Sequence, residues 1–405
     1  MKTEKQKEHI DSSILLLSPF FYPEKISTGK YNSYLAKAIQ EKGADVHIIC
    51  SHPLYPDWKP KKTNLNLPGI NIYRGGGRVF YPRSIILRRL ILEIWFTIHI
   101  LINIVKIRNK ITILVAVFPP TFYMLLLKLI LPKSVTKICI IHDLLGVMAT
   151  SNQNLIRRVL SKILKKIECK TFQHCNKLIC LSTSMRSTLV KDYGVCKEKI
   201  VVHYPFTTIK KGTKNRANLK STFKEAYSHI VYSGALGEKQ IPDKILKLFK
   251  NICLSNKLVK CHFFSQGPIF EMLKQENLAL KNPNILFHDL VDESDLIELY
   301  ERSTLHILPQ ASGTGGGAFP SKLPNLIAAN VPIFAICDID CELSDLLQNY
   351  KLSKIVDVNN ENDWIKQIEI YLDEVKLARD KPSTTMRSLL DKFCIDNLVE
   401  SILNA

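Results

Sequence analysis

Short apolar runs alternate along this chain with longer stretches of helical periodicity. Ile14–Leu17 is apolar, Tyr31–Gly43 repeats apolar residues at helical spacing and ends at a glycine, and Val46–Cys50 is apolar again. Short apolar runs indicate strands, and a 3.6-residue period indicates a helix. The alternation continues along most of the chain. This order predicts the α/β class, with parallel, doubly wound sheets.

The expected strands share short length and apolar composition. They are Ile14–Leu17, Val46–Cys50, Ile70–Tyr73, Thr112–Phe118, Lys137–Ile141, Lys177–Leu181, Ile200–His203, Ile230–Ser233, Cys261–Ser265, Ile285–His288, Leu305–Leu308 and Ile333–Ile336. Two helices are expected to close the chain, Glu361–Leu377 and Thr384–Leu403.

A polar, lysine-rich stretch divides this pattern in two. Residues 207–218 are poor in apolar side chains, and the alternation resumes at Ile230. A chain of 405 residues suits two domains. We expect two doubly wound Rossmann-like domains facing a central cleft, with boundaries at residues 1–208 and 226–385 and a linker at 209–225. Residues 386–405 are expected to form a C-terminal helix that packs back on the N-terminal domain.

One segment of the N-terminal half bears on localisation. Leu87–Ile107 is strongly apolar, but Glu93 and His99 interrupt it. The uninterrupted part is shorter than the roughly 20 residues of a membrane span. Trp95, Phe96 and the flanking cations fit a helix that lies in the membrane interface. A helix buried between a sheet and its neighbours is the alternative.

The charge balance favours anionic partners. The chain has 56 Lys and Arg against 37 Asp and Glu, a net charge of +19 and a pI near 9.3. A field of that sign attracts nucleotide phosphates, nucleic acid or acidic lipid surfaces. The expected helix Leu155–Phe172 is rich in these cations, which fit lipid head groups or a solvated face.

The cysteines and the N-terminal residues indicate in which cellular compartment the protein is expected. Eleven cysteines occur without any CxxC spacing, and several lie in apolar runs. Buried free thiols in a reducing compartment fit this pattern better than a zinc site. The first 13 residues are polar and lack an apolar signal core, so no secretion is expected.

A glycine-rich loop followed by a helix is the strongest local signal. Ser312–Gly317 holds four glycines, and Ser321 fits the N-cap of the next helix. Pro324 then falls in the first turn, and Asn330 suits the left-handed position after the last turn. Lys322 in the first turn opposes the helix dipole, which a phosphate partner would explain. A flexible surface loop with a solvated lysine is the alternative.

Other polar residues and glycines follow the remaining predicted strands. Ligands of open parallel sheets bind at the carboxyl ends of strands. The candidates there are Gly29, Lys30, His142, Asp143, the loop Gly234–Lys239, Gly267 and Asp289. Each has a plainer reading: His142 as a hydrogen-bonded strand-end histidine, Asp143 as a turn cap, and Lys239 as a solvated lysine.

Several of these stretches resemble one enzyme family. YSGALGEKQ (Tyr232–Gln240), SQGP (Ser265–Pro268), HILPQ (His306–Gln310) and FPSKLPNLIAANVPIFA (Phe319–Ala335) are similar to the C-terminal half of family 4 glycosyltransferases of the GT-B fold. Within that family the chain resembles the colanic-acid-type enzymes of bacterial surface polysaccharide synthesis. The N-terminal LLLSPFFYPEKISTGKYNSYLAKAI and LYPDWKP resemble the same group. The match is weakest between residues 84 and 176.

The resemblance implies roles for the candidates. Lys239 and Lys322 would balance the donor diphosphate, and His142 would lie near the transferred sugar, so these three are the expected catalytic residues. Donor contacts are implied for Gly29, Gly234, Lys239, Gly267, Asp289, Leu290, Phe319, Pro320, Ser321, Lys322 and Asn325. Acceptor contacts are implied for Lys30 and Asp143. Fixed cations and N–H dipoles suit a leaving diphosphate, which gains charge as the glycosidic bond breaks.

The chain also departs from the family pattern. Many members carry two glutamates eight positions apart, where this chain has Gly317 and Asn325. No carboxylate nucleophile can therefore be named, and a front-face route, in which the leaving phosphate accepts the acceptor's proton, is the default expectation. Asn325 remains able to hydrogen-bond a donor hydroxyl.

The resemblance implies a retaining transferase in O-antigen, capsule or exopolysaccharide synthesis. We expect a nucleotide-sugar donor, a lipid-linked saccharide acceptor, an anionic membrane surface, no nucleic acid and no metal or other cofactor. The expected location is cytoplasmic and peripheral, on the inner face of the plasma membrane. A GT-B type nucleotide-sugar epimerase and a non-catalytic membrane-docked subunit are the alternatives.

Overall fold

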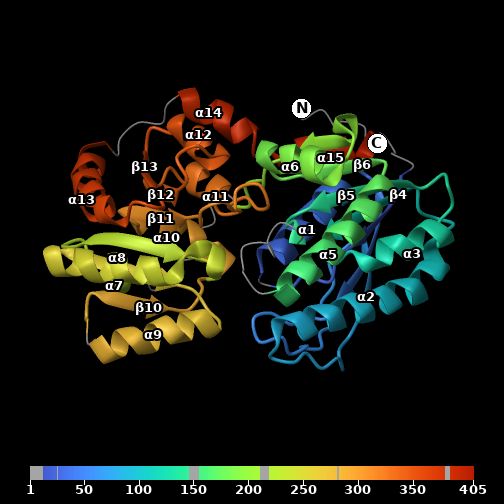
Figure 1. Cartoon of the computed structure of the whole chain (residues 1–405), viewed down its shortest axis with the longest axis horizontal. Coiled ribbons are helices and arrows are strands. Elements are labelled where there is room, and N and C mark those ends of the chain that lie inside the picture. Colours follow the sequence, from blue (N-terminus) through green and yellow to red (C-terminus); the bar gives the residue numbers. More distant parts are fainter. Residues whose placement is uncertain (1–11, 25, 146–154, 210–218, 281, 379–383) are drawn as a thin grey trace, which may run out of the picture. The chain divides into compact units, whose positions relative to one another are not determined.

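The computed structural model describes residues 12–24, 26–145, 155–209, 219–280, 282–378 and 384–405 (Figure 1). The chain forms two compact units. Unit 1 takes the chain up to Tyr204, together with Gly316–Ala318 and Ile395–Ala405. Unit 2 takes Pro205–Gly315 and Phe319–Cys394.

Unit 1 is built on a parallel sheet of seven strands in the order β3-β2-β1-β4-β5-β6-β7. The strands are β1 (Ser13–Leu17), β2 (Asp45–Ser51), β3 (Ile70–Gly75), β4 (Ile113–Phe118), β5 (Thr136–Ile141), β6 (Lys177–Cys180) and β7 (Ile200–Val202). The helices are α1 (Ser27–Glu41), α2 (Ile85–Ile107), α3 (Phe122–Ile130), α5 (Leu155–Gln173), α6 (Thr183–Tyr193) and α15 (Ile395–Leu403).

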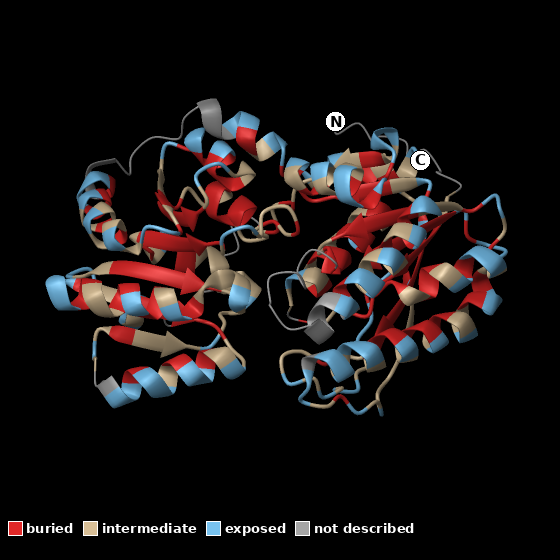
Figure 2. Cartoon of the chain, viewed as in Figure 1, coloured by how far each residue is buried: buried red, intermediate tan, exposed pale blue. Residues whose placement is uncertain are grey.

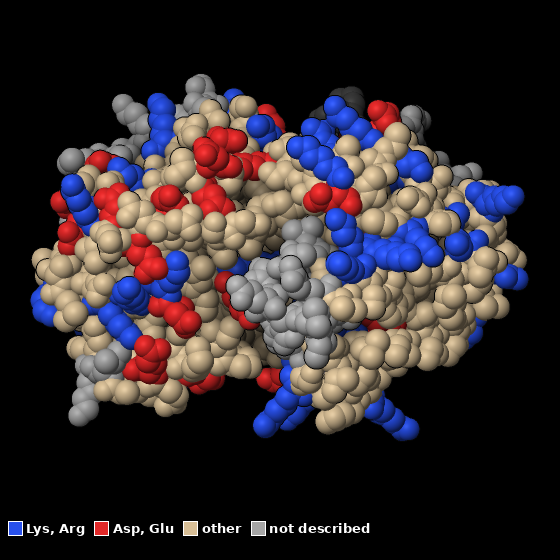
Figure 3. Space-filling model, in the orientation of Figure 1, with Lys and Arg blue, Asp and Glu red and all other residues tan. Residues whose placement is uncertain are grey.

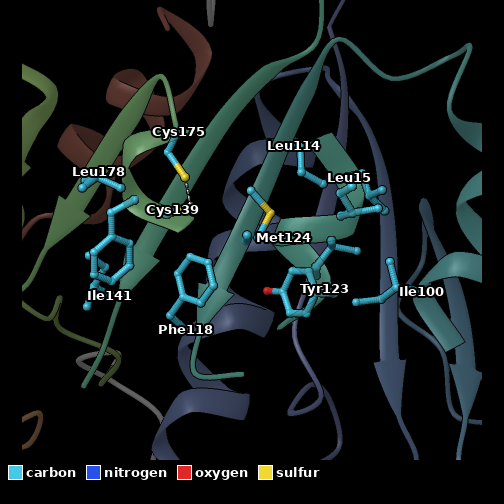
Figure 4. Close-up of a cluster of buried hydrophobic side chains, with 14 of the residues drawn as sticks. Leu15, Ile100, Leu114, Phe118, Tyr123, Met124, Cys139, Ile141, Cys175 and Leu178 are labelled. Carbon is cyan, nitrogen blue, oxygen red and sulfur yellow. Dashed lines mark hydrogen bonds between the residues drawn. The ribbon is translucent and has the colours of Figure 1, made fainter. Parts of the chain in front are cut away.

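The core of unit 1 lies between this sheet and its helices. Strand β4 is buried along its whole length, because helices cover both faces of a parallel sheet (Figure 2). Phe118 stacks on Tyr123 of α3 with ring centroids 6.1 Å apart, and a thiol–thiol hydrogen bond joins Cys139 to Cys175 (Figure 4). All eleven cysteines are free thiols.

The last helix of the chain belongs to this unit. Helix α15 contacts α1. The Lys177 ammonium donates to the Ser401 carbonyl at 2.8 Å, and His203 Nε2 hydrogen-bonds to the Ser401 hydroxyl at 2.7 Å. These two bonds fix α15 to residues near β6 and β7.

Unit 2 is built on a parallel sheet of six strands in the order β10-β9-β8-β11-β12-β13. The strands are β8 (Ser228–Ser233), β9 (Val259–Phe264), β10 (Ile285–His288), β11 (Leu305–Pro309), β12 (Ile333–Cys337) and β13 (Ser353–Asp357). The helices are α7 (Leu219–Thr222), α8 (Pro242–Ser255), α9 (Pro268–Leu280), α10 (Leu296–Arg302), α11 (Leu323–Ala328), α12 (Glu342–Gln348), α13 (Glu361–Ala378) and α14 (Thr384–Asp391).

The sequence located twelve of these strands and missed the thirteenth. Strand β13 was not expected, because Ser353–Asp357 mixes polar and apolar residues at the sheet edge. The single closing helix expected over Thr384–Leu403 is wrong: α14 belongs to unit 2 and α15 to unit 1. Between them the Phe393 carbonyl accepts a hydrogen bond from Thr207 N–H at 3.1 Å.

Candidate active site

The candidate site of unit 2 lies where its strand order changes direction. β8 and β11 are neighbours in the sheet, and the chain winds outward from them to β10 on one side and β13 on the other. The crevice beyond the carboxyl ends of such a strand pair is where open α/β sheets bind ligands. The residues that follow β8 and β11 are the loops that sequence motifs had marked, Gly234–Lys239 and Ser312–Gly317.

Lys322 reaches the carboxyl end of β8. Its ammonium donates to the Ser233 carbonyl at 2.6 Å and lies 3.9 Å from the centre of the Tyr232 ring. A Cβ added to Gly234 would lie 3.5 Å from Lys322 Nζ, so the glycine leaves one side of the amine uncovered. Burial lowers the pKa of Lys322 to about 7. The amine is therefore poised to gain a proton when an anion arrives.

The helix after the glycine-rich loop begins later than expected. Ser321 is not its N-cap: α11 begins at Leu323, with Lys322 in the N-cap position. Pro324 lies in the first turn, as predicted, where no intrahelical N–H is needed. Asn330 follows the last turn with φ of 55°, which confirms the left-handed position.

A buried histidine contacts Ser233, the residue whose carbonyl binds Lys322. His306 Nε2 lies 3.1 Å from the Ser233 hydroxyl, and its Nδ1 lies 3.3 Å from the Ile307 carbonyl. Burial and the nearby charge of Lys322 lower the pKa of His306 to about 3. A neutral imidazole adds no second positive charge beside the lysine. His306 and Ser233 both lie in motifs that carry the family resemblance, but those motifs did not predict a role for either residue.

Hydrogen bonds hold the two loops at this edge. Ala311 N–H donates to the Lys239 carbonyl at 2.8 Å, which joins the start of the glycine-rich loop to the loop after β8. Asp338, just after β12, accepts from the Ser312 hydroxyl at 2.6 Å and from Gly313 N–H at 2.8 Å. No sequence motif points to Asp338, because its partners lie 25 and 26 residues away.

Further candidates lie at the ends of β9 and β10. Gly267 has φ of +101°, and a Cβ there would meet no other atom. Asp289 is exposed and Leu290 is half-buried. Phe319, Pro320 and Ser321, which precede α11, are buried or half-buried. Donor contacts for these residues stay predictions.

Asn325 has protein partners in the structure. Its side-chain oxygen accepts from Thr208 N–H at 2.8 Å, and its side-chain amide donates to the Thr208 hydroxyl at 2.9 Å. The residue is buried. Through these bonds Asn325 holds the segment around Thr208, with which the chain enters unit 2. The predicted contact with a donor hydroxyl would have to use what remains of its hydrogen-bonding capacity.

The unit 1 candidates fall in two places. Gly29 and Lys30 lie in the first turn of α1, which begins four residues before the expected periodicity. A Cβ at Gly29 would lie 2.9 Å from Glu24 Cβ and 3.1 Å from the Glu24 carbonyl oxygen. Close packing against Glu24 therefore requires a glycine here, whatever the ligand. Sequence reasoning missed Glu24, a buried carboxylate that accepts from Leu54 N–H at 2.7 Å and Tyr55 N–H at 3.2 Å.

His142 and Asp143 follow β5. Burial lowers the pKa of His142, and the Asp143 carboxylate opposes this shift. Both side chains are half-buried. Their expected roles beside the sugar and the acceptor stay predictions.

Comparison with known proteins agrees with this geometry. The model of "Glycosyltransferase Family 4" matches residues 28–210, and the model of "Glycosyl transferases group 1" matches residues 214–382. The matched ranges follow the two units and together cover most of the chain. The chain belongs to the family 4 glycosyltransferases of the GT-B type.

Solved structures share the fold of this glycosyltransferase. WaaG, a glycosyltransferase involved in lipopolysaccharide biosynthesis, has a TM-score of 0.71 at 12% identity, covering 97% of this chain and 100% of its own. Sucrose-phosphate synthase from Thermosynechococcus elongatus has a TM-score of 0.73 at 12% identity, with 97% and 96% covered. The S. aureus MnaA–UDP structure has a TM-score of 0.60 at 12% identity, with 97% of both chains covered. Curated protein sequences give no match to this chain.

Over the part of the chain that the structure describes, no group of three or more His, Cys, Asp or Glu side chains is placed to hold a metal ion.

Proposed function

We propose that this glycosyltransferase transfers a sugar with retention of configuration from a nucleotide-sugar to a lipid-linked saccharide. The product would enter a bacterial surface polysaccharide such as O-antigen, capsule or exopolysaccharide. The observation that carries the donor part is the Lys322 amine, held at the carboxyl end of β8 beside a glycine at position 234. An amine at a strand switch point, beside a position without a Cβ, suits a diphosphate.

The chemical step follows from the groups available. As the bond between the anomeric carbon and the diphosphate oxygen breaks, negative charge grows on the leaving phosphate, where protonated Lys322 stabilises it. The acceptor hydroxyl attacks from the same face, and its proton passes to the departing phosphate oxygen. Gly317 and Asn325 stand where many relatives carry glutamates, so this route needs no enzyme carboxylate as nucleophile.

The membrane part of the proposal rests on helix α2. The 22-residue stretch Ile86–Ile107 is long and apolar enough to cross a membrane, but one face of it packs in the core of unit 1 through Phe96, Ile100 and Ile104. Glu93 accepts hydrogen bonds from Thr121 N–H at 2.9 Å and Phe122 N–H at 3.0 Å. A helix tied to the fold in this way suits an interfacial position better than a span.

The opposite face of α2 is exposed and apolar. Its exposed members recur at helical spacing and are Ile86, Leu87, Leu90, Ile94, Ile98, Ile102 and Val105. The neighbouring helix α3 adds Leu126 and Leu129, the second of them 77% exposed. An apolar surface of this extent marks an interaction site. We call these nine residues the α2–α3 surface.

Cations accompany the α2–α3 surface. Exposed lysines and arginines lie on the same helices and on α5, which contacts α3: Arg89 and Lys106 on α2, Lys128 on α3, and Lys162, Lys166 and Lys170 on α5. Figure 3 shows a group of blue Lys and Arg side chains over the part of unit 1 that contains α5. Each cation near an anionic bilayer contributes about 1 kcal/mol of attraction. Apolar side chains flanked by cations are the composition of a peripheral helix on acidic lipid. Such a helix supports the proposal that the enzyme and its lipid-linked acceptor meet at one membrane surface.

The donor assignment is tested with Lys322→Ala. We expect transfer from nucleotide-sugar to membrane extracts carrying lipid-linked saccharides to fall about 100-fold or more. Circular dichroism and thermal unfolding check that the variant is folded. Lys247→Ala removes an exposed lysine of the same unit that pairs with Glu361, and should leave transfer unchanged. Transfer by Lys322→Ala at the rate of wild type would refute the assignment.

A further inference from the structure

Three histidines form a hydrogen-bonded chain across three neighbouring strands of unit 2. His229 of β8 lies with Nδ1 2.9 Å from Nε2 of His262 on β9. His262 lies with Nδ1 3.1 Å from Nε2 of His288 on β10. At the other end, His229 Nε2 lies 2.9 Å from the Lys224 carbonyl. We call His229, His262 and His288 the histidine chain.

The Lys224 carbonyl fixes the direction of every proton in this chain. A carbonyl only accepts, so His229 Nε2 carries a hydrogen and its Nδ1, in a neutral ring, accepts. His262 Nε2 must then donate to it, which leaves His262 Nδ1 as an acceptor for His288 Nε2–H. Burial lowers the pKa of all three rings, that of His262 to about 2, so the rings are neutral near pH 7. His288 Nδ1 is thereby left as a bare acceptor.

Aromatic neighbours hold the rings in place. Phe223 lies 4.9 Å from both the His229 and the His262 ring centres, and Phe264 stacks on His288 at 4.4 Å. A ring packed in this way cannot turn over to exchange its two nitrogens without disturbing its neighbours. Beyond the bond to His262, the described part of the chain gives the His288 ring no further hydrogen-bond partner.

His288, the last member of the histidine chain, lies at the same edge of the sheet as the Lys322 site. Ser233, Phe264 and His288 are register partners and the last residues of β8, β9 and β10. Lys322 donates to the Ser233 carbonyl. Two strand spacings of about 4.8 Å separate β8 from β10, so the lysine anchor and His288 lie about 10 Å apart along one edge. That span is comparable to the reach from a nucleotide's diphosphate across the ribose to its base.

We propose that His288 Nδ1 accepts a hydrogen bond from a ring N–H of the donor's nucleobase and so selects the base. The inference rests on the proposed donor site at Lys322. Uracil and guanine carry a ring N–H where cytosine and adenine carry a bare nitrogen. Uracil or guanine can donate a hydrogen bond to the His288 Nδ1 acceptor. Cytosine or adenine would instead place its nitrogen lone pair against the lone pair of Nδ1. The histidine chain selects uridine over cytidine donors, or guanosine over adenosine donors. His262 is the positioning residue, since it dictates which nitrogen of His288 is bare.

Calorimetric titration of UDP, CDP, GDP and ADP tests this selection. Whichever class of base binds better, pyrimidine or purine, the wild type should bind the nucleotide with the ring N–H about tenfold more tightly than its partner. The comparison is UDP against CDP, or GDP against ADP, and tenfold is the contribution of about one hydrogen bond. His288→Phe keeps the stacking on Phe264 and should bring that ratio to about one, by weakening the preferred nucleotide and removing the repulsion of the other. His262→Phe frees the tautomer of His288 and should lower the ratio partway. His174→Gln changes an exposed histidine of unit 1 and serves as the control.

The outcomes separate the two proposals. If the wild type binds nucleoside diphosphates but its ratio is near one, or if His288→Phe leaves the ratio as it was, the base assignment is wrong and the donor site stands. If no nucleoside diphosphate binds, the donor site fails and the base assignment fails with it. Histidine nitrogen NMR gives an independent measure: a protonated Nδ1 on His288 in the free protein would overturn the proton order.

Discussion

The lowered pKa of Lys322 makes proton uptake a direct reporter of diphosphate binding. With a pKa of about 7 in the free enzyme, the amine is mostly neutral at alkaline pH. A diphosphate beside it favours the charged form and raises that pKa. Binding above neutral pH must therefore draw a proton from the buffer, and binding in mild acid must not.

The magnitudes follow from the same pKa. At pH 8 about one tenth of the free enzyme carries the proton, so binding should take up about 0.9 proton per nucleotide. Above pH 7 the affinity should fall about tenfold, or about 1.4 kcal/mol, for each further pH unit. Nucleotide phosphates are themselves almost fully ionised at pH 8, because their last pKa is near 6. The proton taken up there belongs to the protein.

Calorimetry in two buffers of different ionisation enthalpy measures the uptake directly. Lys322→Arg is the matched variant, since its guanidinium stays charged throughout and should bind with little proton uptake and little pH dependence. Lys322→Met should bind weakly at every pH. Wild-type uptake below about 0.2 proton at pH 8, or equal affinity at pH 7 and pH 9, would refute this reading of the lysine.

Four further outcomes concern other parts of the chain. Burial raises the pKa of Glu93 to about 7, so wild type should lose stability as pH rises from 4.5 to about 7, and Glu93→Gln should flatten this slope, by up to about 3 kcal/mol in denaturant unfolding. Gly29→Ala should cost about 1–3 kcal/mol of unfolding free energy, since its Cβ meets Glu24. Asp338→Ala should raise the donor KM about tenfold by releasing Ser312 and Gly313. Ile98→Gln with Ile102→Gln should weaken sedimentation with anionic vesicles by about 2 kcal/mol.

Each of these has a result that would contradict it. An unchanged pH slope in Glu93→Gln would mean that the carboxylate is solvated. Wild-type stability of Gly29→Ala would show that the Glu24 segment yields easily. A loss of kcat without a change in KM for Asp338→Ala would move that residue from loop anchoring to the chemical step. Vesicle binding that survives both glutamines would point to the cations of α5 as the main contact.

The sequence predicted the strands well because each one is a short apolar run inside a parallel sheet. Strand β13 escaped for the opposite reason, since an edge strand exposes side chains and mixes polar residues into the run. The sequence left two readings of helix α2 open, burial in the core and contact with a membrane interface. In the structure one face of α2 is buried in the core and the opposite apolar face is exposed, because apolar residues occur all around the helix. Membrane contact stays a prediction.

The candidate site was predictable only where it is local. Lys322 and the glycine-rich loop stand together in the sequence, so their pairing could be inferred. Ser233 and His306, which support Lys322, are hydrogen-bonded to each other but lie 73 residues apart in the sequence. The histidine chain joins three strands through contacts 26 and 33 residues apart. Pairings of that kind depend on strand order and register, which hydrophobic periodicity does not encode.

The placement of α15 has a consequence for how such enzymes can be recombined. The chain leaves unit 1 near Tyr204 and, apart from Gly316–Ala318, returns to it only at Ile395, with Ser401 of the last helix bonded to Lys177 and His203. A donor-binding half transplanted from a relative by a single splice would bring a foreign last helix against α1. A working chimera needs two splices, one near Tyr204 and one near Cys394, so that the last eleven residues stay with the unit they complete.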